Sequence, residues 1–548
     1  MPADSGFHPA TAALSTGVTA DVSLVKSLVE QAKVRPDATY VMDIDGRELS
    51  YAATVEQMRI WAAAYQRLGI QRGDHVVTLQ HNTIDALLGW LGLAWMGAIE
   101  APINNDYRGQ LLVHALNLTQ APAMLLKAEF LDRVIEVADK LEHLKTVVVI
   151  DGIDLPNDTP FRLVGGGDFL SRVKPAADLV LPKAWDIMAV LFTSGTTGPS
   201  KAVRLPWAQI HAMTTGSYPV EDLGPDDVIH TPGPTYHVGG KTFPYLAALC
   251  GGRHVMRPFI SRTATPNEYV QFGITTGVVV HAWLDEPKHV DDVQRPLRNL
   301  LTPYRDLRSE EFAERFGGRC FGCFNMTEIS CPITFRTWDD FVYDAEGRMS
   351  CGVVRQGYEA RVVDDNDQPV PPGTPGELII RSDTPWLLNA GYLNNAQATV
   401  DAWRNGWFHT GDAFICDENG QYFFLDRMKD CIRRHNENIS SFEVEAYVTE
   451  HPAVARVAAV AVKRSERAVA DEEIKIVVEL APGKEIDPES LVRWLIPRMP
   501  RFMIPRYVEF MDALPLTPTQ KVQKKLLRES GAGDGVWDRE AAGIALPR

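Results

Sequence analysis

Residues 187–201 read IMAVLFTSGTTGPSK, and this stretch combines two patterns that decide the fold. Its first part, residues 187–192, is apolar and predicts a buried strand. The following run, residues 193–201, consists of small, hydroxylated and glycine residues that let backbone N–H groups turn toward an anion, and it ends in a lysine. The GxxxxGK[ST] spacing of a Walker loop is not present. We therefore predict a phosphate-binding loop of another kind directly after a buried strand; an ordinary surface loop is the plainer alternative.

The pattern around this stretch favours an α/β protein. Up to about residue 350, apolar helices alternate with short strand-like runs, which is typical of a largely parallel sheet with helices on both faces. Beyond that point the strands are shorter and turns more frequent, and from about residue 428 the chain looks like a separate small α/β unit. The predicted strands include residues 76–79, 146–150, 378–380, 454–462 and 474–480; the predicted helices include residues 86–99, 442–449 and 488–496.

Length and composition restrict the class of protein. A chain of 548 residues is too long for one core, so two or more domains are expected. With 45% hydrophobic and 23% charged residues it is globular rather than disordered, collagen-like or a coiled coil. The formal charge of −16 disfavours binding to nucleic acid, although it does not exclude a small anionic ligand.

Cysteine usage and hydropathy favour a cytoplasmic protein. The seven cysteines show no disulfide framework. Cys320 and Cys323 have CxxC spacing, but no second pair accompanies them, so we expect neither a metal nor a redox role. The first residues lack the basic start and apolar block of a signal peptide, and the most apolar stretch, residues 86–99, is too short to span a membrane.

Further motifs follow the loop and resemble, in order, the signatures of the adenylate-forming superfamily, which includes acyl- and aryl-CoA synthetases, nonribosomal-peptide adenylation domains and luciferases. They are FNMTE at 324–328, FHTGD at 408–412, DRMKD at 426–430 continuing to NISSFEVE at 438–445, MIP at 503–505 and LTPTQKV at 516–522. The similarity extends from about residue 45 to about residue 528. Within the superfamily, residues 437–445 most resemble the carnitine-CoA-ligase-like bacterial enzymes.

This resemblance implies a two-domain ligase. An N-terminal domain, residues 1–427, would combine mostly parallel sheets flanked by helices with a β-rich subdomain, and would bind ATP and a small carboxylic acid. A mobile C-terminal α/β domain, residues 428–548, would turn about Lys429. The acid would attack the α-phosphorus of ATP, pyrophosphate would leave, and the acyl- or aryl-adenylate would pass its acyl group to CoA. Because negative oxygen approaches negative phosphate, the site must supply positive charge, hydrogen-bond donors and Mg²⁺.

The resemblance also implies roles for individual residues. The phosphate contacts would come from Thr193, Ser194, Gly195, Thr196, Thr197, Gly198 and Lys201, with Thr327 at the α-phosphate and Glu328 at the magnesium ion. The other nucleotide contacts would come from Asn325, from Tyr304 stacked on adenine, and from Asp412 and Arg427 at the ribose. Lys521 would place its charge between carboxylate and α-phosphate, although Gln520 precedes it where the superfamily usually has glycine. The remaining basic residues of this end, Lys524, Lys525 and Arg528, are interpreted as a solvated helix face.

The acid cannot be named from the sequence. The acyl pocket would lie between His237 and Met326, with His281 and Trp283 as candidate walls. His237 itself is either a gate or wall of that pocket or a structural histidine.

The acyl acceptor has two open alternatives. Asn436 stands where most thioester-forming relatives have a glycine that lines the pantetheine tunnel, and Asn325 replaces a second glycine of the superfamily. Asparagine tolerates positive φ, so the turn itself can persist and CoA can remain the acceptor. Alternatively a side chain in the tunnel excludes CoA, and the acceptor is an amine or a small nucleophile such as nitrite, in secondary metabolism. A nucleotide-binding protein without turnover and luciferase-like oxygenation are further alternatives, and the sequence leaves monomer and homodimer open.

Overall fold

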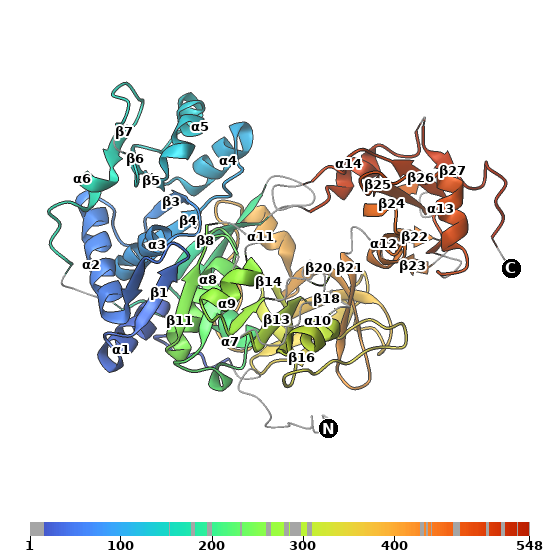
Figure 1. Cartoon of the computed structure of the whole chain (residues 1–548), viewed down its shortest axis with the longest axis horizontal. Helices are drawn as coiled ribbons and strands as arrows, with labels where there is room; N and C mark the ends of the chain where they lie inside the picture. Colours follow the sequence, from blue (N-terminus) through green and yellow to red (C-terminus); the bar gives the residue numbers. More distant parts are fainter. Residues whose placement is uncertain are drawn as a thin grey trace.

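The chain forms a large N-terminal part and a smaller C-terminal part, which Figure 1 shows at the two ends of the long axis. The computed structural model describes residues 16–152, 154–176, 181–193, 200–230, 233–258, 265–278, 284, 297–303, 309–427, 432–434, 437–439, 441–463, 472–499, 503–516, 521–533 and 535–546.

The first sheet of the large part contains the strand predicted before the phosphate loop. Its order is β7-β6-β5-β3-β4-β8-β9, and all neighbours are parallel except β8 and β9. The strands are β3 (His75–Leu79), β4 (Ile99–Pro102), β5 (Ala123–Leu126), β6 (Thr146–Val149), β7 (Arg162–Gly165), β8 (Ile187–Thr193) and β9 (Lys201–Pro206). The predicted strands in this region are therefore confirmed.

The second sheet has the order β16-β15-β14-β13-β12-β10-β11-β1-β2 and is parallel from β14 to β1. Its strands are β1 (Thr39–Asp43), β2 (Glu48–Ser50), β10 (Val228–His230), β11 (Arg253–Met256), β12 (Thr276–Val278), β13 (Asn299–Pro303), β14 (Arg319–Met326), β15 (Ser330–Thr334) and β16 (Val353–Val354). The antiparallel pairs lie at its two edges. Two mostly parallel sheets in one part of the chain match the predicted α/β class.

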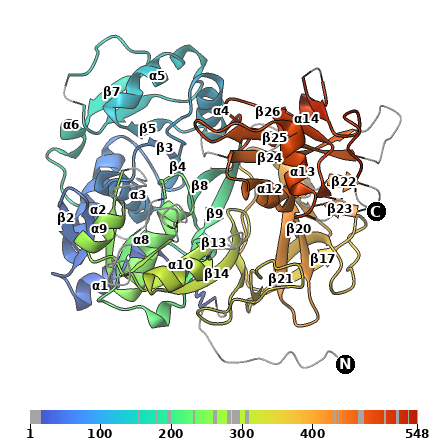
Figure 2. The ribbon, with the colours of Figure 1, turned by 45° about the vertical axis from the view of Figure 1, so that its right-hand side comes forward.

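Helices fill the space between the sheets and cover their outer faces (Figures 1 and 2). One core cluster joins residues of both sheets to six helices, α1 (Leu24–Val34), α2 (Tyr51–Arg67), α3 (Ile84–Met96), α6 (Gly166–Leu170), α7 (Trp207–Ser217) and α8 (Gly239–Cys250). The outer helices are α4 (Gly109–Thr119) and α5 (Leu131–Ile135) on the first sheet, and α9 (Thr265–Gln271) and α10 (Ser309–Phe316) on the second. The short elements η2 (Ala128–Phe130), η3 (Ala138–Lys140) and η4 (Val220–Asp222) lie in connections between the larger elements.

The predicted helix over residues 86–99 is wrong at its C-terminal end. The helix stops at Met96, because Gly97 takes φ of 74° and caps it, and Ile99 already begins β4. Thr83 caps the other end by accepting a hydrogen bond from the Ala86 N–H. The core position expected for this helix is confirmed, since both of its tryptophans, Trp90 and Trp95, are buried.

A buried ion pair joins α8 to the first sheet. The Lys241 ammonium bonds to the Glu100 carboxylate, and the two side chains are 2% and 1% exposed. Thr78 donates its hydroxyl to Glu100 Oε1 at 2.9 Å, and Lys241 Nζ lies 4.3 Å from the ring centre of Trp90. The first turn of α8 is thus fixed to the centre of β3 and β4.

The β-rich subdomain is a five-stranded antiparallel sheet. Its order is β17-β18-β20-β19, with β21 paired to β20. The strands are β17 (Tyr358–Val363), β18 (Gly376–Ser382), β19 (Trp403–Arg404), β20 (Trp407–Cys416) and β21 (Tyr422–Arg427), and the helix α11 (Ala396–Ala402) precedes β19. The predicted strand over residues 378–380 lies within β18.

The C-terminal part has its own core. It contains the two-stranded ribbon β22 (Ile432–Arg434) and β23 (Glu437–Ile439), and a sheet of order β24-β25-β26-β27. These strands are β24 (Val454–Lys463), β25 (Glu472–Leu480), β26 (Tyr507–Phe510) and β27 (Trp537–Asp538), and the helices are α12 (Ser441–Thr449), α13 (Pro488–Leu495) and α14 (Lys524–Glu529). The four predicted elements of this part are confirmed, whereas a boundary between residues 427 and 428 stays a prediction.

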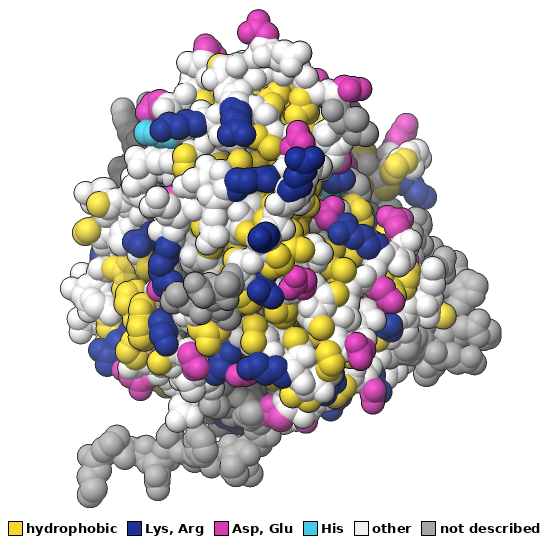
Figure 3. All heavy atoms as spheres, turned by 90° about the vertical axis from the view of Figure 1, so that its left-hand side faces the viewer, with side chains coloured by type: hydrophobic (Ala, Val, Ile, Leu, Met, Phe, Trp, Pro, Cys, Tyr) yellow, Lys and Arg dark blue, Asp and Glu magenta, His cyan; other side chains and the backbone are white. Residues whose placement is uncertain are grey.

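The surface carries both signs of charge. On the end of the large part drawn in Figure 3, Lys and Arg side chains are interspersed with Asp and Glu, and apolar side chains lie between them. Within the described part of the chain, no helix combines the length and the hydropathy needed to cross a membrane.

Candidate active site

The predicted phosphate loop leaves the first sheet at the end of β8. Thr193 and Lys201 face each other across the β8–β9 pair, and the Thr193 hydroxyl donates to the Lys201 carbonyl at 3.5 Å. Ser200 is held from α4 and the segment before it, because its hydroxyl bonds to that of Tyr107 at 2.8 Å and its carbonyl to His114 Nε2 at 3.1 Å. The loop residues Ser194, Gly195, Thr196, Thr197 and Gly198 lie outside the described residues. Both ends of the predicted loop are therefore fixed to neighbouring elements.

The motif at residues 324–328 ends β14 on the second sheet. Glu328 is 8% exposed, and Thr327, which is half-buried, accepts a hydrogen bond on its carbonyl from Gln209 Nε2 at 2.7 Å. Ser330 donates its hydroxyl to the Gln209 carbonyl at 3.0 Å, so α7 holds the turn on both sides. Asn325 donates its amide toward Cys323 Sγ at 3.5 Å.

One aromatic residue connects the two motifs. Lys201 Nζ lies 4.8 Å from the ring centre of Tyr392, and the Tyr392 hydroxyl donates to Glu328 Oε1 at 3.3 Å. The structure thus brings the end of the phosphate loop and the acidic residue of the second motif to one place. Three residues that we did not predict hold the second motif here through hydrogen bonds to Thr327 or Glu328, namely Gln209, Asn389 and Tyr392.

The predicted ribose-binding residues lie opposite each other on two neighbouring strands. Asp412 on β20 pairs in register with Arg427 on β21. Asp412 is 4% exposed, and its N–H donates to the Thr410 hydroxyl at 3.1 Å. The N–H of the preceding residue, Gly411, donates to Glu377 Oε1 at 2.9 Å and so fixes the backbone of β20 just before Asp412. These bonds fix the backbone of Asp412, whose carboxylate has the two acceptor oxygens that the ribose prediction requires.

His237 lies in the turn that leads into α8. Its N–H donates to the Pro234 carbonyl at 3.0 Å, and its ring centre lies 4.9 Å from that of Tyr236. Burial lowers the pKa of His237 from 6.5 to about 4, and the positive charge of Lys521 contributes in the same direction. Burial also raises the pKa of the Tyr236 phenol to about 12. At neutral pH the imidazole is therefore uncharged, and the lysine of the C-terminal part lies within electrostatic range of the N-terminal part.

The segment around Lys521 is fixed to the C-terminal core. Leu516 and Val522 form a β-bridge, and the Gln523 N–H donates to the Pro515 carbonyl at 2.8 Å. Lys524 on α14 bonds to Glu445 Oε1 on α12 at 2.7 Å.

The interpretation of the following basic residues as a solvated face is wrong for Lys524. Its side chain is 16% exposed because it pairs with Glu445. The interpretation is confirmed for Lys525, whose side chain is 54% exposed.

Several predicted residues lie outside the described residues, namely Tyr304, His281, Trp283, Lys429 and Asn436, and the side chain of Arg427 is not described either. Their roles stay predictions.

Cys320 and Cys323 lie on β14 and pack into different clusters, Cys320 with Phe312 and Phe316 and Cys323 with the central helices. Residues three apart on a strand point to opposite faces, so this CxxC sequence does not bring its two thiols together.

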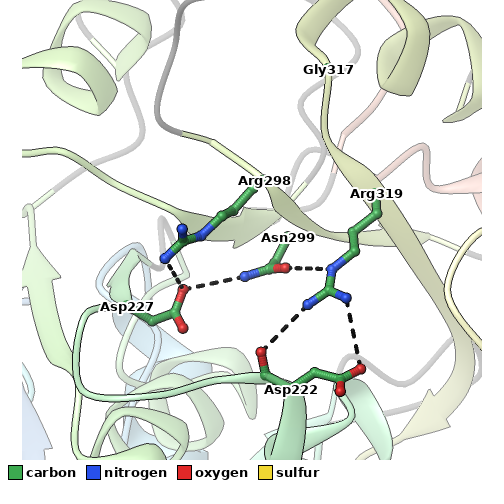
Figure 4. Close-up of a pocket in the computed structure, with 6 residues that line it drawn as sticks. All are labelled: Asp222, Asp227, Arg298, Asn299, Gly317 and Arg319. Atoms are coloured by element: carbon green, nitrogen blue, oxygen red, sulfur yellow. Dashed lines mark hydrogen bonds and ion pairs between the residues drawn. The ribbon is translucent and has the colours of Figure 1, made fainter.

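A pocket of about 470 Å³ opens at the amino ends of the strands in the second sheet (Figure 4). It is lined by Asp222, Asp227, Arg298, Asn299, Gly317 and Arg319. Its charges pair with one another, since Arg298 Nη2 lies 3.4 Å from Asp227 Oδ1 and Arg319 Nη1 lies 3.8 Å from Asp222 Oδ2. The phosphate loop, Glu328 and His237 instead follow the carboxyl ends of β8, β14 and β10, where α/β sheets bind their ligands. This pocket is therefore separate from the candidate active site.

Comparison with protein families agrees with this arrangement. The model of the AMP-binding enzyme family matches residues 28–393, and that of the AMP-binding enzyme C-terminal domain matches residues 443–521. The chain belongs to the AMP-binding enzyme family. The family match spans both sheets of the large part and the motifs that meet at Tyr392.

Three individual proteins to which the chain is similar are CoA ligases or synthetases. A crotonobetaine/carnitine–CoA ligase of Escherichia coli is 30% identical over 502 residues, which cover 87% of this chain and 93% of that one. The fold is similar to that of an anthranilate CoA ligase in complex with anthranoyl-AMP, with a TM-score of 0.80 at 22% identity, covering 94% of this chain and 98% of the other. It is also similar to an o-succinylbenzoate coenzyme A synthetase of Bacillus subtilis in complex with ATP and a magnesium ion, with a TM-score of 0.77 at 19% identity over 91% and 98% of the two chains. The expected fold class is confirmed.

Proposed function

We propose that this AMP-binding enzyme is an ATP-dependent acid–CoA ligase that forms an acyl- or aryl-adenylate and then a thioester. The observation that carries the proposal is the contact of Lys201 and Glu328, from separate motifs, with one tyrosine at the carboxyl edge of the two sheets. The ammonium group can bind a polyphosphate, and the carboxylate beside it can bind the cation that accompanies the polyphosphate. The relationship to a CoA ligase at 30% identity over 87% of the chain supports CoA as the acceptor.

In the first step a carboxylate oxygen of the acid attacks the α-phosphorus, and the bond from that phosphorus to pyrophosphate breaks. Lys201 binds phosphate oxygens, and Thr327 donates its hydroxyl near the α-phosphate. Lys521 neutralises charge where the acid meets the nucleotide, which is consistent with its electrostatic effect on His237. Asp412 orients the ribose through its two acceptor oxygens.

A magnesium ion fits the residues present. Magnesium is usually bound by one or two carboxylates together with substrate phosphates, and Glu328 supplies a buried carboxylate of which Oε1 is oriented by the Tyr392 hydroxyl. The bound ion would offset phosphate charge. Lys201 and Tyr392 set the position of the groups around it.

In the second step the CoA sulfur attacks the acyl carbon and AMP leaves. His237, which is neutral at pH 7 because of its burial, lies in the turn before α8 and would line the approach to the acid. Since it carries no charge, it neither pairs with the acid nor repels Lys521.

A pyrophosphate-release screen over carboxylic acids tests the first step. We expect release that requires ATP, Mg²⁺ and a specific acid. A protein that binds ATP but releases no pyrophosphate with any acid would contradict the proposal and favour nucleotide binding without turnover.

The acceptor is tested separately with the acyl-adenylate already formed. We expect CoA to consume it and yield a thioester, and amines or nitrite to leave it intact. If CoA is inert, Asn436→Gly should partly restore thioester formation with pyrophosphate release nearly unchanged. Asn405→Gly, which changes an asparagine at φ of 51° in a surface turn, is the matched control.

A further inference from the structure

Residues 389–392 form a strap that lies between the phosphate-loop strand and the second motif. On one side, Tyr392 forms a β-bridge with Val203, and the Arg204 N–H donates to the Gly391 carbonyl at 3.1 Å. On the other side, Asn389 donates to the Glu328 carbonyl through its N–H at 3.0 Å and through Nδ2 at 2.8 Å. The strap therefore ties β9 of the first sheet to the end of β14 in the second.

The strap is itself held in one conformation. The Gly391 N–H donates to Asn389 Oδ1 at 2.8 Å, and Gly391 has φ of 89°, which favours glycine. The Tyr392 N–H donates to the Thr399 hydroxyl on α11 at 3.0 Å. Both Asn389 and Tyr392 are buried, with exposures of 6% and 8%. The backbone of Tyr392 is thus fixed by β9, by α11 and by the turn from Asn389 to Gly391.

The side chain of Tyr392 contacts both charged groups of the site. Its ring centre lies 4.8 Å from Lys201 Nζ, and its hydroxyl lies 3.3 Å from Glu328 Oε1. A phenol is protonated at neutral pH, and a carboxylate only accepts, so the hydroxyl is the donor in this contact.

This arrangement keeps two opposite charges apart. In the described part of the chain Lys201 has no carboxylate within ion-pair distance, and its ammonium lies over the aromatic ring instead. A cation over a ring face keeps its N–H groups available to a further acceptor, whereas a direct ion pair would occupy them.

We propose that Tyr392 is a positioning residue that couples the phosphate-binding lysine to the magnesium-binding glutamate, its ring holding Lys201 and its hydroxyl orienting Glu328. This inference rests on the proposed function, since it assigns the ligands that the two charged groups receive. It implies that the two halves of the tyrosine side chain act on different parts of Mg·ATP, the ring on phosphate and the hydroxyl on the cation.

Calorimetric titration of ATP into the full chain, with Mg²⁺ and with EDTA, separates these two effects. Tyr392→Phe keeps the ring and removes the hydroxyl. In EDTA we expect this variant to bind ATP within twofold of the wild-type affinity. Mg²⁺ increases the affinity for ATP, and we expect that increase to be roughly three- to tenfold smaller in the variant, which is the scale of one hydrogen bond. Tyr392→Leu, or Tyr392→Met if the leucine variant does not fold, removes the ring and should also weaken ATP in EDTA.

Tyr422→Phe is the matched control, because Tyr422 is 6% exposed and its hydroxyl bonds to the Ala360 carbonyl at 3.1 Å within the β-rich subdomain. Circular dichroism confirms that each variant is folded. An unchanged magnesium dependence in Tyr392→Phe would overturn the role of the hydroxyl, and an unchanged affinity in EDTA for the leucine or methionine variant would overturn that of the ring. A wild-type chain that binds no ATP would instead refute the proposed function.

Discussion

Breaking the buried ion pair between α8 and β4 should strongly destabilise the N-terminal part. In Lys241→Met the side chain keeps a similar length but loses its charge, so the Glu100 carboxylate stays buried at 1% exposure without its cation. The hydroxyl of Thr78, at 2.9 Å from Oε1, then remains as a neutral donor. Removing one partner of a buried pair costs about 3–5 kcal/mol, and we expect a loss in this range.

Urea unfolding followed by tryptophan fluorescence measures this loss, since Trp90 lies 4.3 Å from the ammonium that is removed. The matched control is Lys525→Met, which breaks a surface pair with Glu529 whose side chains are 54% and 59% exposed. That pair should contribute at most about 0.5 kcal/mol.

The double variant Lys241→Met/Glu100→Gln tests the cause. It removes both charges and keeps an acceptor for Thr78, so it should recover a large share of the stability lost in the single variant. A single variant that is no less stable than the control would refute the argument, and so would a double variant that is less stable than Lys241→Met.

Three further predictions concern the site and the pH dependence of stability. Lys521→Ala should lower pyrophosphate release about a hundredfold, because one well-placed charge is lost, and should leave the circular dichroism unchanged; a wild-type rate would remove Lys521 from the site. Asp412→Ala should raise the KM for ATP more than tenfold and leave that for the acid nearly unchanged, since each hydrogen bond to a charged group contributes about 1.5–3 kcal/mol; an unchanged KM for ATP would contradict the ribose contact. Burial lowers the pKa of His254 from 6.5 to about 3, with His230 contributing, so the folded protein binds fewer protons than the unfolded chain between these values and its stability falls as the pH drops below 6.5. His254→Leu should reduce that fall between pH 6.5 and 4 by up to about 3 kcal/mol, and an unchanged pH profile of urea unfolding would show that His254 is not its cause.

The sequence predicted best what depends on local pattern. Periodicity or turn residues within a short window predict the strand over residues 187–192, the helix over 488–496 and the shorter strands and more frequent turns after residue 350. The predicted helix end at residue 99 failed because Gly97 inside an apolar run was not treated as a cap.

Contacts between segments that are distant in the sequence could not be predicted from such local patterns. Tyr392 meets Val203 and Glu328 only because α7 and both sheets fix their relative positions. The sequence around it, a glycine followed by an aromatic residue, is too common to mark a site. Lys524 likewise looked like a surface lysine, because its partner Glu445 lies on a helix that precedes two strands of the same domain.

The way the residues on either side of Lys521 are held has a mechanical consequence. Leu516 and Val522 are joined by a β-bridge, and Lys524 is bound to α12. The backbone around Lys521 is therefore joined to the core of the C-terminal part, so any displacement of that part also displaces the lysine. If Lys521 acts on the adenylate as proposed above, a ligand or cross-link that holds the C-terminal part away from ATP would slow adenylation although it touches no residue of the nucleotide site.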